Sequence, residues 1–195
     1  LMDAAVKGYT ETARLLIAKG AEVDKVNNDG WTALMEAAEK GYTEIARLLI
    51  ANGAAVDHAD SHGETALMWV AYNGYTETAE LLIARGAKVN HSDSDGETAL
   101  MWAAQCGRLE AVGLLIARGA KVDQVNNDGE IALMFAAWNG NIETAELLIV
   151  RGAEVDKADN DGRTALMWAV QEGYTETAEL LIARGAKVNH SDSDG

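Results

Sequence analysis

The sequence of 195 residues has no proline, a single cysteine and only 6% aromatic residues. Cys106 alone cannot form an internal disulfide, and no Cys/His spacing typical of structural zinc is present. One cysteine leaves the compartment open and favours the cytoplasm. Apolar runs stay well short of the roughly 20 residues that a membrane-spanning helix needs, and residues 1–20 lack the layout of a signal peptide. We therefore expect no membrane partner.

Basic residues are also scarce. Lys and Arg total 16 against 31 Asp and Glu, which gives a formal net charge of −15. Because phosphate binding needs clustered Lys and Arg, this charge argues against a nucleic-acid partner and favours a basic protein or peptide instead. Hydrophobic residues make up 48% of the chain, enough to exclude a disordered protein and to build a core.

The residues that are abundant recur with a fixed period. Of the 19 glycines, all but Gly113 fall in three registers that step by 33 residues, and all six methionines share a further register. Such a period is the signature of a repeat protein. It predicts one domain, 1–195, without linkers: a partial repeat 1–28, full repeats 29–61, 62–94, 95–127, 128–160 and 161–193, and a stub 194–195. Since the chain opens and closes inside a repeat, we expect it to belong to a longer array.

Each repeat contains two segments with helical spacing of apolar residues. In repeat 29–61, residues 32–41 predict a short helix with leucine and alanine on its core face, ended by Gly41 in a left-handed conformation. Residues 43–52 predict a second helix. Its inward residues are Ile45, Leu48 and Leu49. The rest of the repeat is rich in Asn, Asp, Ser and Gly and predicts a projecting loop or hairpin.

The order Asp-Gly-x-Thr-Ala-Leu-Met-x-Ala-Ala, Gly, Leu-Leu-Ile, Gly-Ala-x-Val-Asn/Asp resembles the ankyrin repeat over the whole chain. The resemblance implies an all-α solenoid of stacked helix-turn-helix repeats with projecting β-hairpin or turn loops. Thr-Ala-Leu-Met stands where the family has Thr-Pro-Leu-His. Loss of the proline and the histidine weakens the ordering of the helix start, and we expect Met to compensate by packing. Ile131 replaces the threonine in one copy and removes another polar anchor.

One position of the first helix carries a large aromatic residue in four consecutive repeats. It lies about 200° from the core leucine on a helical wheel, and its first two copies are Asp3 and Glu36, so we expect it to be solvent-accessible. An exposed apolar row marks an interaction surface. In the ankyrin resemblance, the variable positions one turn further on point into the concave groove. The predicted partner-binding residues are therefore Trp69, Trp102, Phe135 and Trp168, with Tyr72 and Trp138 beside them and Trp31 after a loop glycine.

Each of these features has a structural alternative. Each ring in the aromatic row could cover its neighbour and the next loop as a structural ladder. The Asn and Asp residues of the loop tips either satisfy tight turns or recognise a basic partner. The shared histidine register of His58, His91 and His190 is better explained by hydrogen-bonded or solvated surface side chains than by metal ligands. We expect no metal, since Trp102 stands where an EF-hand loop through residues 93–96 needs its glutamate.

Catalytic motifs of hydrolases, phosphate-binding loops and zinc proteases are missing, and Cys106 has no histidine in its repeat. The sequence therefore predicts no enzyme and no cofactor. It predicts a scaffold that binds a protein or peptide in its concave groove. Alternatives are a structural element that associates end to end because polar caps are missing, the ankyrin region of a larger protein, or a binder of flat ligands such as sugars on the Trp row.

Overall fold

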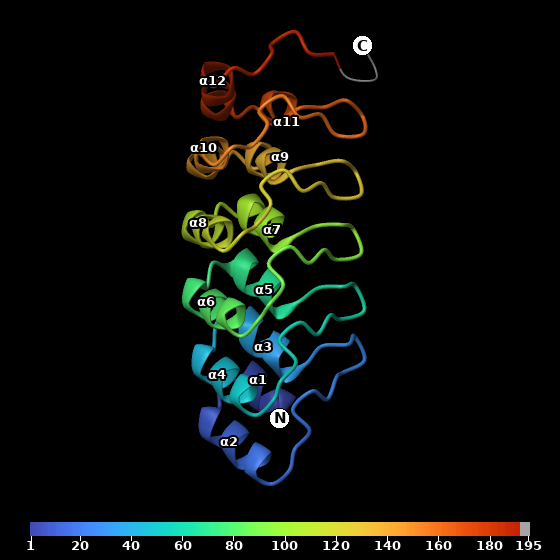
Figure 1. Ribbon diagram of the computed structural model, residues 1–195, viewed down its shortest axis with the longest axis vertical. Helices are drawn as coiled ribbons and strands as arrows, with labels where there is room; N and C mark the ends of the chain where they lie inside the picture. Colours follow the sequence, from blue (N-terminus) through green and yellow to red (C-terminus); the bar gives the residue numbers. More distant parts are fainter. Residues whose placement is uncertain (192–195) are drawn as a thin grey trace.

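The computed structural model describes residues 1–191, which form twelve helices stacked in two columns with loops projecting along one side (Figure 1). The first helix of each repeat forms the inner column: α1 (Met2–Val6), α3 (Ala33–Glu39), α5 (Ala66–Asn73), α7 (Ala99–Gln105), α9 (Ala132–Trp138) and α11 (Ala165–Gln171). The second helices form the outer column: α2 (Thr10–Ala18), α4 (Thr43–Ala51), α6 (Thr76–Ala84), α8 (Leu109–Ala117), α10 (Ile142–Val150) and α12 (Thr175–Ala183).

This architecture confirms the predicted all-α solenoid of repeated helix-turn-helix units. The predicted stub 194–195 and residues 192–193 of the last predicted repeat lie outside the described residues. In the part of the chain that is described, the longest helices have nine residues, and none could span a membrane.

A glycine ends the first helix as predicted. Gly41 follows α3 with φ at 72°, a conformation that residues with a side chain rarely adopt. The N–H of Tyr42 donates to the carbonyl of Ala37 at 2.8 Å, which closes the helix end. A Cβ atom at Gly41 would also come within 2.9 Å of the Tyr75 ring of the next repeat. The periodic glycine therefore allows both the turn and the close approach of two repeats.

In repeat 95–127, threonine and methionine together order the start of the first helix, α7. Thr98 accepts a hydrogen bond from the Met101 N–H at 3.4 Å, and the Met101 sulfur accepts one from the Thr98 N–H at 3.4 Å. The Met101 side chain is fully buried. The methionine that replaces the histidine thus contributes packing and a weak acceptor at this helix start. Ile131, at the same position as Thr98, is buried without a side-chain cap.

The inner column is buried on more than one face. Ala33, Leu34, Met35, Ala37 and Ala38 of α3 are all at most 2% exposed. This burial arises because each interior helix of the column contacts the inner helices of both neighbouring repeats and the second helix of its own repeat. Small alanine side chains allow the helices to approach closely. The helical wheel predicted that only one face of this helix, formed by leucine and alanine, lies in the core. The buried surface of the helix is wider than that prediction and includes Met35.

The projecting loops are hairpins that are hydrogen-bonded to one another along the stack. Asp60 is typical of the tips: its carboxylate accepts hydrogen bonds from the N–H groups of His62 and Glu64 at 2.8 and 2.9 Å. Neighbouring hairpins are joined by backbone bonds, such as the one from the Ser94 N–H to the His62 carbonyl at 2.8 Å. Asn27, Asp93, Asn126 and Asp159 repeat the Asp60 arrangement. The turn explanation of these residues is confirmed.

Candidate functional site

The aromatic register of the inner helices is largely buried. Trp102, Phe135 and Trp168 are 9%, 4% and 8% exposed, and Trp69 is half-buried. The expectation that this register is solvent-accessible is therefore wrong for three of the four rings. A helical wheel describes one helix with one packed side, whereas here every inner helix after α1 also packs against the inner helix of the preceding repeat. Rings that point away from the core leucine consequently meet the adjacent repeat.

Several of these rings contact one another across repeat boundaries. The centroids of Trp31 and Trp69 lie 4.9 Å apart, and those of Trp69 and Trp102 lie 5.2 Å apart with the planes at 86°. Trp138 stacks on Trp168 at 5.2 Å with 29° between the planes. Such separations are typical of favourable aromatic pairs. These contacts are those expected of a structural ladder between repeats.

The positions one helical turn further on remain accessible. Tyr72 is 40% exposed and Trp138 is 41% exposed, at corresponding places on α5 and α9. Trp31, on the hairpin before α3, is half-buried. The predicted site residues therefore divide into a buried set that packs between repeats and an accessible set beside it.

The two sets meet in a pocket between α5 and α7. This aromatic pocket has a volume of about 270 Å³ and is lined by Trp69, Tyr72, Glu97, Trp102 and Gln105. Tyr72 lies with its centroid 6.2 Å from that of Trp69 and 5.9 Å from that of Trp102, at 67° and 75°. The three rings thus form three mutually tilted walls. A pocket of this size admits one side chain rather than a whole small-molecule ligand.

Glu97 places an unusual carboxyl group at the wall of this pocket. Burial and, to a smaller extent, the negative charge of Asp93 raise the pKa of Glu97 to about 7, against an opposing hydrogen bond from the Trp102 indole. At neutral pH the group is therefore divided between its protonated and ionised forms. A cation near Glu97 would favour the ionised form.

Arg163 occupies the same register as Glu97, two repeats later. Its guanidinium carbon lies 4.5 Å from the centroid of the Trp168 ring, and Trp168 corresponds to Trp102. Arg163 also forms a salt bridge of 2.6 Å with Asp161. In repeat 161–193, the guanidinium of Arg163 therefore lies over the Trp168 ring and next to the carboxylate of Asp161.

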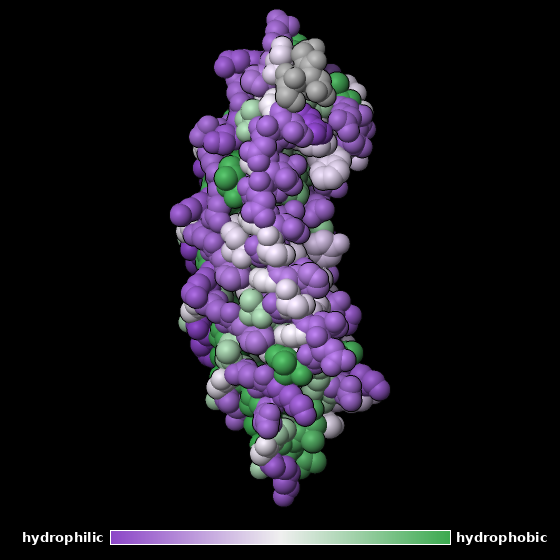
Figure 2. Space-filling model, turned by 90° about the vertical axis from the view of Figure 1, so that its right-hand side faces the viewer, coloured by the Kyte–Doolittle hydropathy of each residue, from purple (hydrophilic) through white to green (hydrophobic). Residues whose placement is uncertain are grey.

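The surface around the hairpins is polar and acidic. Figure 2 shows that this face is mainly hydrophilic, with hydrophobic surface gathered near the N-terminal end. Within residues 1–191, four of five hairpins have an exposed aspartate at the same register just after the tip: Asp29, Asp95, Asp128 and Asp161. The aromatic pocket therefore opens beside a row of negative charges.

The sequence matches a family model of ankyrin repeats in three copies, at residues 1–93, 58–126 and 100–192. The chain belongs to the ankyrin repeat family. Ankyrin repeats are generally protein–protein interaction modules, and the family is typically non-catalytic. No curated protein matches the chain.

In this ankyrin repeat protein, an Asn or Asp after the loop valine joins successive repeats, a role that the sequence analysis did not assign. Asn90 accepts a hydrogen bond from the Lys121 N–H at 2.8 Å and donates one to the Gly119 carbonyl at 2.9 Å. Asp57 accepts from the Lys88 N–H at 2.8 Å. The signal was present in the sequence, since an Asx residue recurs at this register in every repeat.

Two histidines of the shared register, His58 and His91, form hydrogen bonds that join neighbouring hairpins. The Nε2 atoms of His58 and His91 lie 3.0 and 2.9 Å from the carbonyl oxygens of Gly30 and Gly63 in the preceding hairpins. These contacts confirm that the two side chains are hydrogen-bonded. Among residues 1–191, no group of three His, Cys, Asp or Glu side chains could hold a metal ion.

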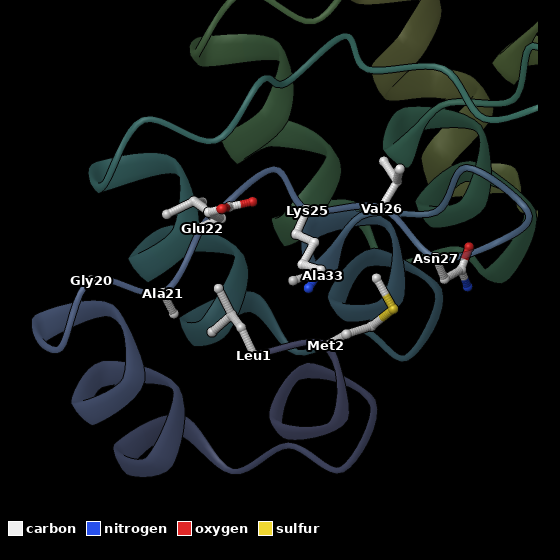
Figure 3. Close-up of a pocket in the computed structure, with 10 residues that line it drawn as sticks. Leu1, Met2, Gly20, Ala21, Glu22, Lys25, Val26, Asn27 and Ala33 are labelled. Carbon is white, nitrogen blue, oxygen red and sulfur yellow. The ribbon is translucent and has the colours of Figure 1, made fainter.

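The ends of the described stack expose apolar side chains. A cavity of about 420 Å³ lies at the N-terminal end, where Leu1 and Met2 face Lys25, Val26 and Asn27 of the first hairpin (Figure 3). A second cavity of about 430 Å³ lies at the C-terminal end. Its apolar residues are Leu166, Met167, Val170, Ile182 and Val188, of which the last three are exposed.

Proposed function

We propose that this chain is a non-catalytic scaffold that binds a protein or peptide partner along the surface formed by the inner helices and hairpins. The observation that carries the proposal is the aromatic pocket, in which Trp69, Tyr72 and Trp102 line an opening beside an acidic hairpin row. Aromatic residues in partly enclosed positions supply much of the energy of protein interfaces. The family's general role in protein interaction supports the same conclusion.

The predicted site residues contribute to this function in two ways. Tyr72 and Trp138 contact the partner directly, since about two fifths of each side chain is exposed. Trp69 and Trp102 form the walls of the pocket beside Tyr72, and Trp31 packs against Trp69. The two remaining predicted residues are buried: Trp168 stacks on the accessible Trp138, and Phe135 belongs to the hydrophobic core.

The charge of the chain favours a basic partner. The formal net charge is −15, and the hairpin tips add exposed aspartates next to the pocket. Opposite charge on the partner would speed its association and fix its orientation. We therefore expect binding to weaken as the salt concentration rises.

The non-catalytic part of the proposal is supported by Cys106, the one thiol in the chain. Burial raises the pKa of Cys106 above its usual value, against the opposing charge of Arg108 and a hydrogen bond from Tyr72. A raised pKa leaves little thiolate at neutral pH, and the thiolate is the nucleophile. The environment of Cys106 is thus that of an unreactive thiol.

A peptide selection tests the proposed surface. A random peptide library displayed on phage is selected against the chain, and the affinities of the selected peptides are measured for Tyr72→Ala, Trp138→Ala and Val150→Ala. Val150 is an exposed apolar residue at the end of α10, so its variant is the matched control. We expect the first two variants to weaken binding about 30-fold, the size of a hot-spot loss of about 2 kcal/mol, and the control to bind normally. Equal binding by all three variants would place the interface elsewhere.

End-to-end association is a second candidate function, favoured by the apolar side chains exposed at the two ends. Val170, Ile182 and Val188 occupy positions at the C-terminal end that are solvent-exposed. Exposed apolar patches of this kind mark interaction surfaces. Sedimentation velocity of the chain over a range of concentrations tests it: a rising sedimentation coefficient that Val170→Glu abolishes supports association, and a constant monomer value contradicts it.

A further inference from the structure

The aromatic pocket combines ring faces with one carboxylate, and this combination suits a particular chemical group. Trp69, Tyr72 and Trp102 present tilted rings with centroids 5.2 to 6.2 Å apart, and Glu97 lies at their edge. The faces of aromatic rings attract cations, most strongly where water is partly excluded. A carboxylate beside the rings adds the opposite charge.

The protein itself shows that a cation can rest on this aromatic row. Arg163 lies over the Trp168 ring at 4.5 Å, with Asp161 as its carboxylate partner. At the corresponding place two repeats earlier, the register holds Glu97 instead of arginine, so no cation of the same register covers Trp102. The pocket at Trp102 therefore offers ring faces and a carboxylate to a cation from outside.

The number of N–H donors on the cation decides whether a primary or a methylated ammonium group fits the pocket. A primary ammonium carries three N–H donors, and each needs an acceptor when it leaves water. The side-chain acceptors in the lining are Glu97, Gln105 and the hydroxyl of Tyr72. Glu97 already accepts a hydrogen bond from the Trp102 indole, and Tyr72 is hydrogen-bonded to Cys106, so few acceptors are left for three N–H groups. A methylated ammonium keeps its charge, loses donors and gains apolar surface that packs on the rings.

We propose that the aromatic pocket binds the methylated ammonium group of a lysine side chain in the partner, with Trp69, Tyr72 and Trp102 around the methyl groups and Glu97 as the counter-charge. This proposal rests on the proposed function, because it names the anchoring residue of the protein or peptide that lies on the same surface. The acidic hairpin row would hold the basic residues that flank such a lysine.

Binding of this group is coupled to the ionisation of Glu97. In the free protein the pKa of Glu97 is about 7, raised mainly by burial and in addition by the negative charges of Asp93, Asp95 and Glu130. The cation favours the carboxylate, so the affinity rises between pH 6 and pH 8 as the free protein loses the Glu97 proton. A purely apolar ligand would show no such dependence.

The test uses three probes with the full chain: Nα-acetyl-Nε-trimethyllysine amide, Nα-acetyl-lysine amide, and an uncharged analogue of the first in which a carbon atom replaces the quaternary nitrogen. Two-dimensional NMR follows the indole N–H signals of Trp69 and Trp102 during titration. We expect the trimethylated probe to bind at least tenfold more tightly than the other two, a difference of about 1.4 kcal/mol. Trp168, already covered by Arg163, serves as the internal reference.

Two variants at one position sharpen the test. Glu97→Gln keeps the size of the side chain and is expected to weaken the trimethylated probe about tenfold and remove the rise from pH 6 to pH 8. Glu97→Arg is expected to place the protein's own guanidinium over Trp102, as Arg163 lies over Trp168, and to abolish binding. Glu130→Gln alters the same register in the next repeat, outside the pocket lining, and is expected to retain binding. Circular dichroism verifies that each variant is folded.

The outcomes separate this inference from the proposed function. Equal affinity for the trimethylated probe and its uncharged analogue would overturn the choice of a cation. A second outcome is that none of the three probes binds, while the selected peptides still depend on Tyr72 and Trp138 and bind the Glu97→Arg variant normally. This outcome would overturn the methyl-lysine pocket and leave the scaffold function intact. Tight binding of the trimethylated probe that Glu97→Arg abolishes would support the pocket even if the peptide selection failed.

Discussion

Removing the Trp102 ring should destabilise the fold rather than only impair binding. The side chain is 9% exposed and contacts Trp69 of the preceding repeat and Tyr72, at centroid distances of 5.2 and 5.9 Å. Truncation of a buried aromatic residue to alanine costs about 3–5 kcal/mol. In a chain of this length each kcal/mol lowers the melting temperature by about 2–4 °C, so Trp102→Ala should lower it by about 6–20 °C.

A matched variant distinguishes burial from the mere loss of an indole. Trp138 is 41% exposed and stacks on Trp168. Because the loss scales with the apolar area removed from the interior, Trp138→Ala should cost about two thirds as much as Trp102→Ala. Thermal and urea unfolding followed by circular dichroism compare the two variants directly.

Hydrogen exchange locates the damage along the stack. In a repeat protein each unit contacts only its neighbours, so the loss at Trp102 should speed exchange in α5 and α7 before it affects α11. If Trp102→Ala instead melts within about 1 °C of the unmodified protein, the ring does not stabilise the repeat boundary. The explanation of the aromatic register as a ladder between repeats would then be refuted.

Three further changes test the fold. Gly113→Ala should stabilise the chain by about 1 kcal/mol in urea unfolding, because Gly113 lies inside α8 and an added Cβ would meet only a Leu147 methyl at 3.8 Å; destabilisation would contradict this. Asn90→Ala should lower the free energy of unfolding by about 1 kcal/mol in the same assay, because it removes both side-chain hydrogen bonds to the next repeat. Asn189 has the same register and is exposed, so Asn189→Ala is the control and should have little effect. The pKa of Glu97 is about 7 in the folded chain, above its ordinary value of 4.5, so the folded chain retains a proton that the unfolded chain releases. The free energy of unfolding should therefore fall as the pH rises through this window. Urea midpoints at pH 5 and pH 8 measure this fall, which should be smaller in Glu97→Gln.

The periodic parts of the fold could be predicted from the sequence because their causes are local. Gly41 must follow a helix end where φ is positive, and Asp60 must accept hydrogen bonds within its own hairpin. Both depend on residues a few positions away. The 33-residue period then places the same local structure in every repeat.

The burial of the aromatic register could not be predicted from one helix. Glu36 and Trp102 share a register, and the charge of Glu36 suggested an open position, yet the Trp102 ring meets α5 of the preceding repeat. Burial of Glu36 accordingly raises the pKa of its carboxyl. Contacts between repeats depend on their separation and rotation, and neither quantity can be read from a helical wheel.

The aromatic pocket shows the same limit. Glu97 and Trp102 are five residues apart across the corner between hairpin and helix, which brings their side chains together, as it does for Arg163 and Trp168. Tyr72 completes the pocket from another repeat. The candidate residues were identified individually from the sequence, but their assembly into one site follows from the stacking of repeats.

The most direct test of the account is the NMR footprint of a selected peptide on the isotope-labelled chain. We predict that the peptide shifts the indole signals of Trp69, Trp102 and Trp138 and the amide signals of the hairpins, and leaves the signals of the outer helices unchanged. Shifts confined to α4, α6, α8 and α10, or to the two ends of the stack, would contradict a binding surface on the inner helices and hairpins.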